Sequence, residues 1–142
     1  MPSPPKRRGP RRDFLGAAAL AALPFRPARA ADTPLQSAMR RAEAAREEAV
    51  RAGDQPYGAV VLREGVVLAV APSRVVTAGD PTAHAEMEAI RAAARALGSR
   101  DLSGSVLVST SRPCRMCEAA AAWAGISRMV HGTALTDAGA PR

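Results

Sequence analysis

The chain is poor in aromatic residues and in cysteine. Aromatic side chains make up 3% of its 142 residues, and beyond residue 30 only Tyr57 and Trp123 occur. A core of this chain must therefore be built mainly from Ala, Val and Leu, which requires helices and strands to pack closely. The two cysteines, Cys114 and Cys117, are too close in sequence to form a disulfide framework for a domain of this length. We interpret them as part of a site.

The body of the chain also lacks a large excess of charge. Residues 1–30 contain seven of the 20 basic and one of the 13 acidic residues, whereas residues 31–142 contain 13 basic and 12 acidic side chains. A nearly neutral body disfavours nucleic acid as a partner, because a long polyanion requires a basic surface, although a local patch stays compatible with this balance. The length favours one domain.

The first thirty residues are typical of an export signal. The motif Pro10-Arg11-Arg12-Asp13-Phe14-Leu15 precedes a weakly apolar run and the cleavage pattern Ala28-Arg29-Ala30. Paired arginines before such a run resemble a twin-arginine signal, and the run is too short to span a bilayer. We predict a signal over 1–30 and an exported, periplasmic or extracellular domain over 31–142 without a membrane anchor. A disordered tail or an anchor is the alternative.

The pattern of the body predicts alternating helices and strands. The expected elements are a helix over 35–52, a β-hairpin over 59–62 and 66–70, a helix from Asp80 to about Leu97, a strand over 105–109, a helix from Pro113 to about Ala124 and a strand over 127–131. This order predicts an α/β domain in which a mixed sheet carries helices on both faces.

Two of the predicted helix starts carry the residues that can bind a metal or transfer protons. His84-Ala85-Glu86 lies at one of them, and Pro113-Cys114-Arg115-Met116-Cys117 lies at the other. A spacing of three residues lets the two sulfurs face one point, and two thiolates with one imidazole suit zinc. Three protein ligands leave a fourth tetrahedral position open for water, whose pKa zinc lowers towards about 7.

The combination predicts one catalytic zinc ion per chain, held by His84, Cys114 and Cys117. Glu86 follows His84 by two residues, so it can approach the open position without ligating and act as general acid and base. A His-x-Glu motif with a Pro-Cys-x-x-Cys motif is typical of zinc deaminases. A lone His-x-Glu is commonly a polar helix start, and a lone Cys-x-x-Cys is commonly a redox pair or half of a structural zinc site. We predict a structural role for His131.

Four segments of the chain resemble the cytidine and deoxycytidylate deaminase-type zinc proteins, within them the guanine deaminase and tRNA adenosine deaminase branch. These segments are residues 56–61, 80–87, 113–117 and 123–126. The resemblance implies a three-layer α/β/α sandwich with five strands, and a homodimer. Because Trp123-Ala124 looks more like guanine deaminases, it favours a guanine-like purine base or nucleoside as substrate. Adenosine in tRNA is the alternative.

The resemblance also names candidate substrate contacts and departures from the family pattern. The candidate contacts are Ser73, Ala85 and Trp123, and relatives commonly have Asn where Ser73 stands. Arg112 stands where relatives commonly have Glu, and the chain ends where relatives continue, so we expect a shortened C-terminal strand and helix. A zinc-retaining fold without turnover, and a redox or structural zinc module built on Cys114 and Cys117, are the competing hypotheses.

Overall fold

The computed structural model describes residues 1, 3 and 30–142, and residues Ala31–Arg142 form one compact unit. The predicted export signal lies outside the described residues. None of the described helices is long and apolar enough to cross a membrane.

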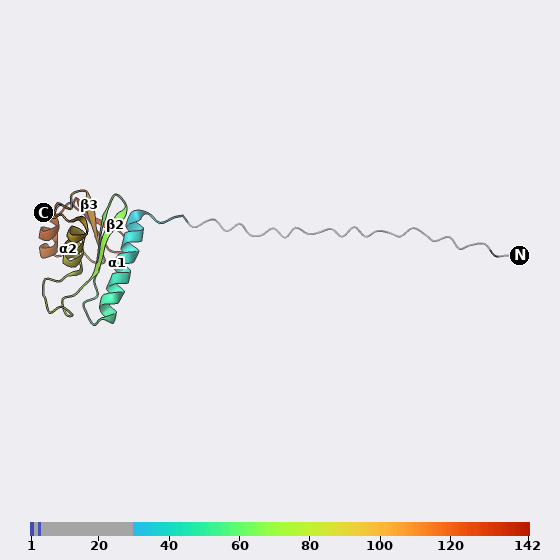
Figure 1. The fold of residues 1–142 in the computed structure, drawn as a ribbon, viewed down its shortest axis with the longest axis horizontal. Helices are drawn as coiled ribbons and strands as arrows, with labels where there is room; N and C mark the ends of the chain where they lie inside the picture. The colour runs from blue at the N-terminus through green and yellow to red at the C-terminus, as the bar shows by residue number, and fades with distance from the viewer. Residues whose placement is uncertain (2, 4–29) are drawn as a thin grey trace. The chain divides into compact units, whose positions relative to one another are not determined.

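The folded unit is a five-stranded mixed sheet between helices (Figure 1). Its elements in chain order are α1 (Pro34–Arg51), β1 (Gly58–Arg63), β2 (Val66–Pro72), α2 (Ala85–Leu97), β3 (Ser105–Ser109), α3 (Arg115–Trp123), β4 (Arg128–His131) and β5 (Thr136–Gly139). The strand order is β2-β1-β3-β4-β5, and only the β3–β4 pair is parallel. The expected mixed sheet with helices on both faces is confirmed.

Two apolar clusters separate the faces of the sheet. On one face α1 packs against Val60 and Leu62 of β1, and on the other α2 and α3 pack against Ala59 and Val61. Successive side chains of a strand point to opposite faces, so the continuous apolar run of β1 fills both clusters. Figure 1 shows α1 on one side of the sheet and α2 on the other. The three-layer sandwich follows.

Small residues allow α1 to lie close to the sheet. The helix buries Ala38, Ala42, Ala45 and Ala49. A Cβ atom at Gly58 would lie 2.0 Å from the carbonyl oxygen of Ala42, so any larger residue there would push helix and strand apart. This is the close packing that the scarcity of aromatic residues predicts.

The start of α2 differs from the prediction. The helix begins at Ala85, and the segment from Asp80 is a turn in which the Asp80 carboxylate accepts hydrogen bonds of 2.7 Å from the Thr82 backbone N–H and of 2.7 Å from its hydroxyl. An aspartate that binds the backbone two residues onward forms an Asx-turn. The prediction of a helix from Asp80 is therefore wrong, because Asp-Pro here is a turn signal.

The fifth strand is a second difference, because the residue pattern predicted only four. β5 pairs antiparallel with β4 through Val130 and Asp137, and the connecting turn is closed by a 2.8 Å hydrogen bond from the Leu135 N–H to the Gly132 carbonyl. Its sequence Thr-Asp-Ala-Gly has low strand propensity, so the pairing could not be seen in the pattern. Among the described residues, no helix follows β5.

Candidate metal centre and active site

Both sequence motifs lie where a helix begins on the same face of the sheet. His84 is the N-cap of α2 and Cys114 is the N-cap of α3, and neither side chain caps its helix with a hydrogen bond. N-caps are commonly Ser, Thr, Asp or Asn, which satisfy first-turn amides and contribute about 1 kcal/mol. Both positions are therefore occupied by side chains that serve another purpose.

The three predicted ligand atoms converge. Cys114 Sγ lies 3.6 Å from Cys117 Sγ, and each sulfur lies 3.7 Å from Nδ1 of His84. With ordinary zinc–ligand bonds at tetrahedral angles, two sulfurs would be about 3.8 Å apart, and a sulfur and a nitrogen about 3.6 Å apart. The residues fit a zinc ion. Within residues 30–142 this is the one group of three such side chains close enough to hold a metal.

The distance between the sulfurs also bears on the redox hypothesis. A disulfide requires about 2.05 Å between sulfurs, and both cysteines are free in the structure. Burial raises the pKa of the Cys117 thiol, with the nearby Glu86 charge acting in the same direction. Reactive redox cysteines have a lowered pKa instead, so the environment of Cys117 disfavours a reactive redox thiol.

Glu86 lies beside the ligands without belonging to them. It is 5% exposed, and its Oε2 atom lies 3.7 Å from Cys117 Sγ. Burial raises the pKa of the Glu86 carboxyl, because the charged form loses its water. A buried carboxyl with a raised pKa can hold a proton nearer to neutral pH, as a general acid and base must.

The loop before Cys114 is fixed by its neighbours. The Thr110 N–H donates to the Gly58 carbonyl at 3.0 Å, and the Gly58 N–H donates to Thr110 Oγ1 at 3.2 Å. The Ser109 hydroxyl donates to the Ser111 carbonyl at 2.6 Å. The end of β3 is thus hydrogen-bonded to the start of β1, and this fixes the position of the backbone that leads to Cys114.

Asp54 holds the loop that leads to His84, a role that the sequence did not reveal. Its carboxylate accepts hydrogen bonds from the Ser73 hydroxyl at 2.9 Å, from the Thr77 N–H and hydroxyl at 2.7 and 2.9 Å, from the Val76 N–H at 3.1 Å and from the Gln55 N–H at 2.8 Å. Burial acts to raise the pKa of Asp54, but these hydrogen bonds outweigh it and hold that pKa well below its usual range. In the sequence, Asp54 marks only the end of a helix.

Asp54 therefore anchors the loop between β2 and α2. The same loop is closed by a 2.9 Å hydrogen bond from the Arg74 N–H to the carbonyl of Ala83, the residue before His84. Ser73, a candidate substrate contact, is buried and its hydroxyl donates to Asp54. Its role in binding a substrate stays a prediction.

The other predicted site residues lie in different surroundings. The Ala85 side chain is buried in the apolar cluster, so only its backbone could contact a substrate. Trp123 is the last residue of α3 and is 88% exposed. It is six residues beyond Cys117, the nearer ligand on the same helix, which is a rise of about 9 Å, so the chain does not bring it to its own metal ligands. His131 lies at the end of β4, outside the ligand group.

A three-ligand metal set between two helix starts, on one face of a mixed sheet, defines a metal-dependent α/β protein. Residues 32–133 match the family model described as the cytidine and deoxycytidylate deaminase zinc-binding region, and the chain belongs to this family. In this family the metal is zinc, and His84, Cys114 and Cys117 form a potential zinc site.

Known proteins of this family resemble the chain over most of the folded unit. It is 40% identical to the guanine deaminase of Bacillus subtilis (strain 168) over 92 residues, which cover 64% of this chain and 59% of that protein. It is 43% identical to a tRNA-specific adenosine deaminase of Agrobacterium fabrum over 93 residues, 63% of this chain and 61% of that protein. The X-ray structure of the B. subtilis guanine deaminase matches with a TM-score of 0.65 at 37% identity, covering 68% of this chain and 62% of that one. The chain thus spans about three fifths of these relatives.

Proposed function

We propose that the protein is a zinc-dependent hydrolytic deaminase that replaces the ring amine of a nucleobase or nucleoside with oxygen and releases ammonia. The observation that carries this proposal is the buried Glu86 carboxyl, which lies 3.7 Å from a sulfur of the three-ligand set without joining that set. A structural zinc site closes its coordination with a fourth protein ligand, whereas a catalytic site keeps a position open. Zinc, when bound, supplies a Lewis acid that activates water.

The side chains around the ligands have separate tasks in this proposal. Glu86 takes a proton from the attacking water at Oε2 and returns it to the amine nitrogen, which leaves as ammonia. The first-turn amides of α2 and α3 are not capped by their own N-cap side chains. Such amides at helix starts can orient a polar substrate or water. The Asp54 hydrogen bonds hold the loop that leads to His84.

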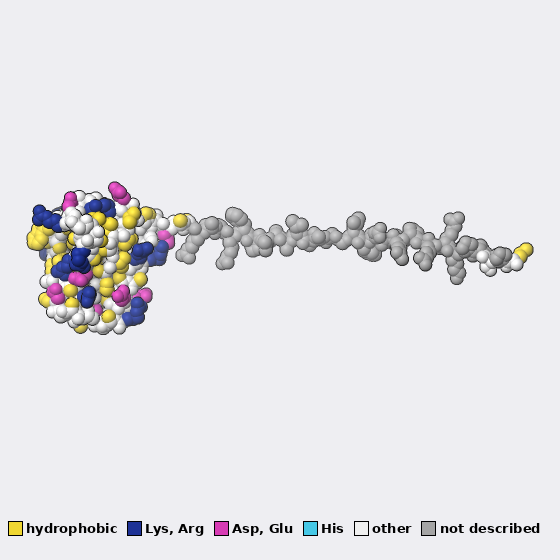
Figure 2. Space-filling view, viewed as in Figure 1, with side chains coloured by type: hydrophobic (Ala, Val, Ile, Leu, Met, Phe, Trp, Pro, Cys, Tyr) yellow, Lys and Arg dark blue, Asp and Glu magenta, His cyan; other side chains and the backbone are white. Residues whose placement is uncertain are grey.

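A guanine-like purine is the substrate that we favour. The relation to a guanine deaminase and the near balance of charge in residues 31–142 support a small substrate. The face of the folded unit seen in Figure 2 mixes basic, acidic and hydrophobic side chains, and no large patch on this face has a single sign of charge. The relation to a tRNA-specific adenosine deaminase, of similar identity, supports adenosine in tRNA as the second candidate.

An ammonia assay with zinc-loaded protein tests this proposal. We expect release from guanine or guanosine, and inosine formation in tRNA would instead select the second candidate. Glu86→Gln should keep zinc and lose activity about 100-fold to 10,000-fold, because proton transfer contributes on this scale. Glu88→Gln is the matched control on the same helix, since Glu88 pairs with Arg91 at 2.7 Å and is not part of the ligand group. Equal activity of Glu86→Gln and wild type would disprove the assignment.

We further propose that the protein forms a homodimer and is exported through its N-terminal segment. The exposed Trp123 at the end of α3 supports the first of these, because large exposed aromatic side chains are enriched at interfaces. Sedimentation of the wild type and of Trp123→Ala tests the dimer, and a monomeric wild type contradicts it.

The proposed export has a separate test. The double variant Arg11→Lys/Arg12→Lys should block export, which cell fractionation measures.

A further inference from the structure

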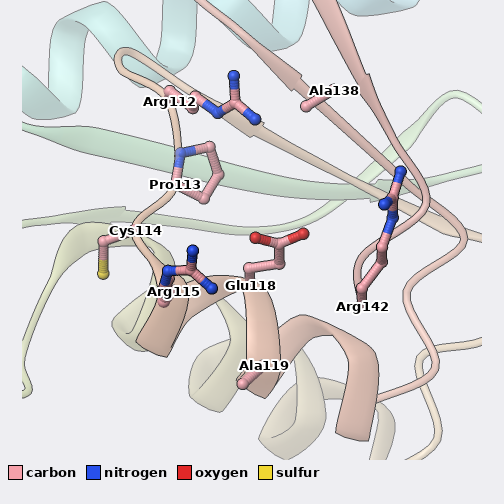
Figure 3. Close-up of a pocket in the computed structure, with 8 residues that line it drawn as sticks. All are labelled: Arg112, Pro113, Cys114, Arg115, Glu118, Ala119, Ala138 and Arg142. Atoms are coloured by element: carbon pink, nitrogen blue, oxygen red, sulfur yellow. The ribbon is translucent and has the colours of Figure 1, made fainter.

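We propose that a cavity beside the start of α3 binds the phosphate group of a small ligand. The cavity has a volume of about 730 Å³, and its lining includes Arg112, Arg115, Arg142 and Glu118. Pockets for small ligands span about 300–1,000 Å³, so a nucleoside monophosphate fits this volume. Figure 3 shows that the charged side chains come from the loop before α3, from α3 itself and from the end of the chain.

The charges of the lining are unbalanced. Among the side chains of the lining, three are guanidinium groups and one is a carboxylate, that of Glu118. Among the ion pairs of residues 30–142, none includes Arg112, Arg115 or Arg142. Three like charges around one cavity repel one another, and an anion placed between them would relieve that repulsion. The excess of positive charge therefore selects an anionic ligand.

The residue type points to phosphate. A guanidinium group presents its N–H donors in a planar fork that matches two oxygens of a phosphate, and such charge-assisted pairs are among the strong hydrogen bonds. Two arginines from one segment and a third from a distant one can surround a tetrahedral group on different sides. Arg112 and Arg115 flank Pro113 and Cys114, so the hydrogen bonds between Thr110 and Gly58 position the backbone from which two of the three exposed side chains extend.

The cavity is separate from the metal centre, although they share a wall. Cys114 lines the cavity, but Figure 3 shows its sulfur directed away from the arginines. His84, Glu86 and Cys117 are not part of the lining. Phosphate binding at this place therefore goes beyond the proposed deamination, and it can be measured without turnover.

A small ligand accounts for the observations better than a nucleic acid. The 13 basic and 12 acidic residues of the body nearly cancel, which disfavours a long basic surface around the cavity. A polyanion requires such a surface along its path. The outcome with RNA is therefore included in the test.

Calorimetric titration of the full chain tests the site with inorganic phosphate, guanosine 5′-monophosphate and guanosine. We expect saturable binding of the first two, weakened by NaCl, and a contribution of the phosphate to the affinity of the nucleotide over guanosine. The double variant Arg112→Ala/Arg115→Ala should weaken phosphate binding at least about tenfold, because each lost charged hydrogen bond has a large effect. Glu118→Gln should strengthen it several-fold, because the like charge of its carboxylate is removed.

A matched control separates this site from general charge effects. Arg51→Ala/Arg100→Ala removes the same charge from exposed positions outside the cavity and should leave phosphate binding unchanged. Zinc content of each variant shows that the metal centre is intact. Absence of saturable phosphate binding overturns the proposal, and so does an equal loss in the control pair. Binding of an RNA stem-loop through these arginines, without binding of phosphate or the nucleotide, also overturns it. If neither the wild type nor any variant releases ammonia, that result contradicts the proposed deamination and not the phosphate site.

Discussion

The two faces of the sheet use their helices differently. On one face α1 begins with a complete capping box, in which Gln36 N–H donates to Thr33 Oγ1 at 3.2 Å and Thr33 N–H donates to Gln36 Oε1 at 2.8 Å. On the other face α2 and α3 have His84 and Cys114 as N-caps without cap hydrogen bonds. The comparison teaches that the start of α1 is stabilised by its cap, whereas the helix starts opposite give up capping in exchange for metal ligands.

The largest expected effect is the loss of the metal from the α2 and α3 face. Cys114→Ala leaves two ligands, which hold zinc far more weakly than three, so zinc and ammonia release should both be lost. Elemental analysis and the ammonia assay measure this. Ser37→Ala, at a half-buried position of α1 on the opposite face of the sheet, is the control and should retain zinc. Full zinc occupancy in Cys114→Ala would show that the ligand set is wrong.

The next effect concerns the α1 face. Gly58→Ala places a methyl group 2.0 Å from the Ala42 carbonyl, which the backbone can relieve only by moving α1 from β1. We expect the free energy of unfolding to fall by about 3 kcal/mol. Urea denaturation measures it, and Val66→Ala at an exposed position of β2 should cost less than about 1 kcal/mol. Equal stability of Gly58→Ala and wild type would mean that the close approach is not needed.

The third effect concerns the loop between β2 and α2, which Asp54 anchors. Since the pKa of Asp54 is held below its usual range in the folded state, its contribution is present above the unfolded pKa of about 3.9 and is lost as the pH falls through the folded value. Asp54→Asn should lower the melting temperature at pH 7, and the difference from wild type should shrink below about pH 4. Thermal melts between about pH 2 and 7 measure this.

The matched control for that experiment is Asp137→Asn. Asp137 pairs with Arg128 at 2.9 Å on the surface, where an ion pair contributes little. Its melting temperature should differ less from wild type at pH 7. A constant difference between Asp54→Asn and wild type across the acid range would contradict the role of the Asp54 hydrogen bonds.

The smallest expected effect comes from changing the N-cap residues of α1 and α2. Thr33→Ala removes the α1 cap and should cost about 1 kcal/mol of unfolding free energy. His84→Ser gives α2 a capping side chain and should stabilise the zinc-free protein by about 0.5–1 kcal/mol while preventing zinc binding. Denaturation after chelation measures both variants. A destabilised zinc-free His84→Ser would show that His84 has a structural role besides its metal role.

Local sequence signals predicted most of the helices and strands. The Ala-rich run of α1 and the valines of β1 and β3 agree with their intrinsic preferences, so the prediction was confirmed there. The start of α2 was wrong because the Asp80 carboxylate binds the Thr82 backbone in a turn. β5 was missed because its pairing with β4 depends on the turn at Gly132, not on the side chains of the strand.

By itself, the sequence determined which residues can hold the metal and which carboxyl accompanies them, because the spacing within His84-x-Glu86 and Cys114-x-x-Cys117 is local geometry. The tertiary structure alone decided that Asp54 meets Ser73 and Thr77, and that Arg142 joins Arg112 and Arg115 at one cavity. These groups are separated by loops whose paths depend on packing and hydrogen bonds between distant segments. No periodicity in the chain encodes such meetings.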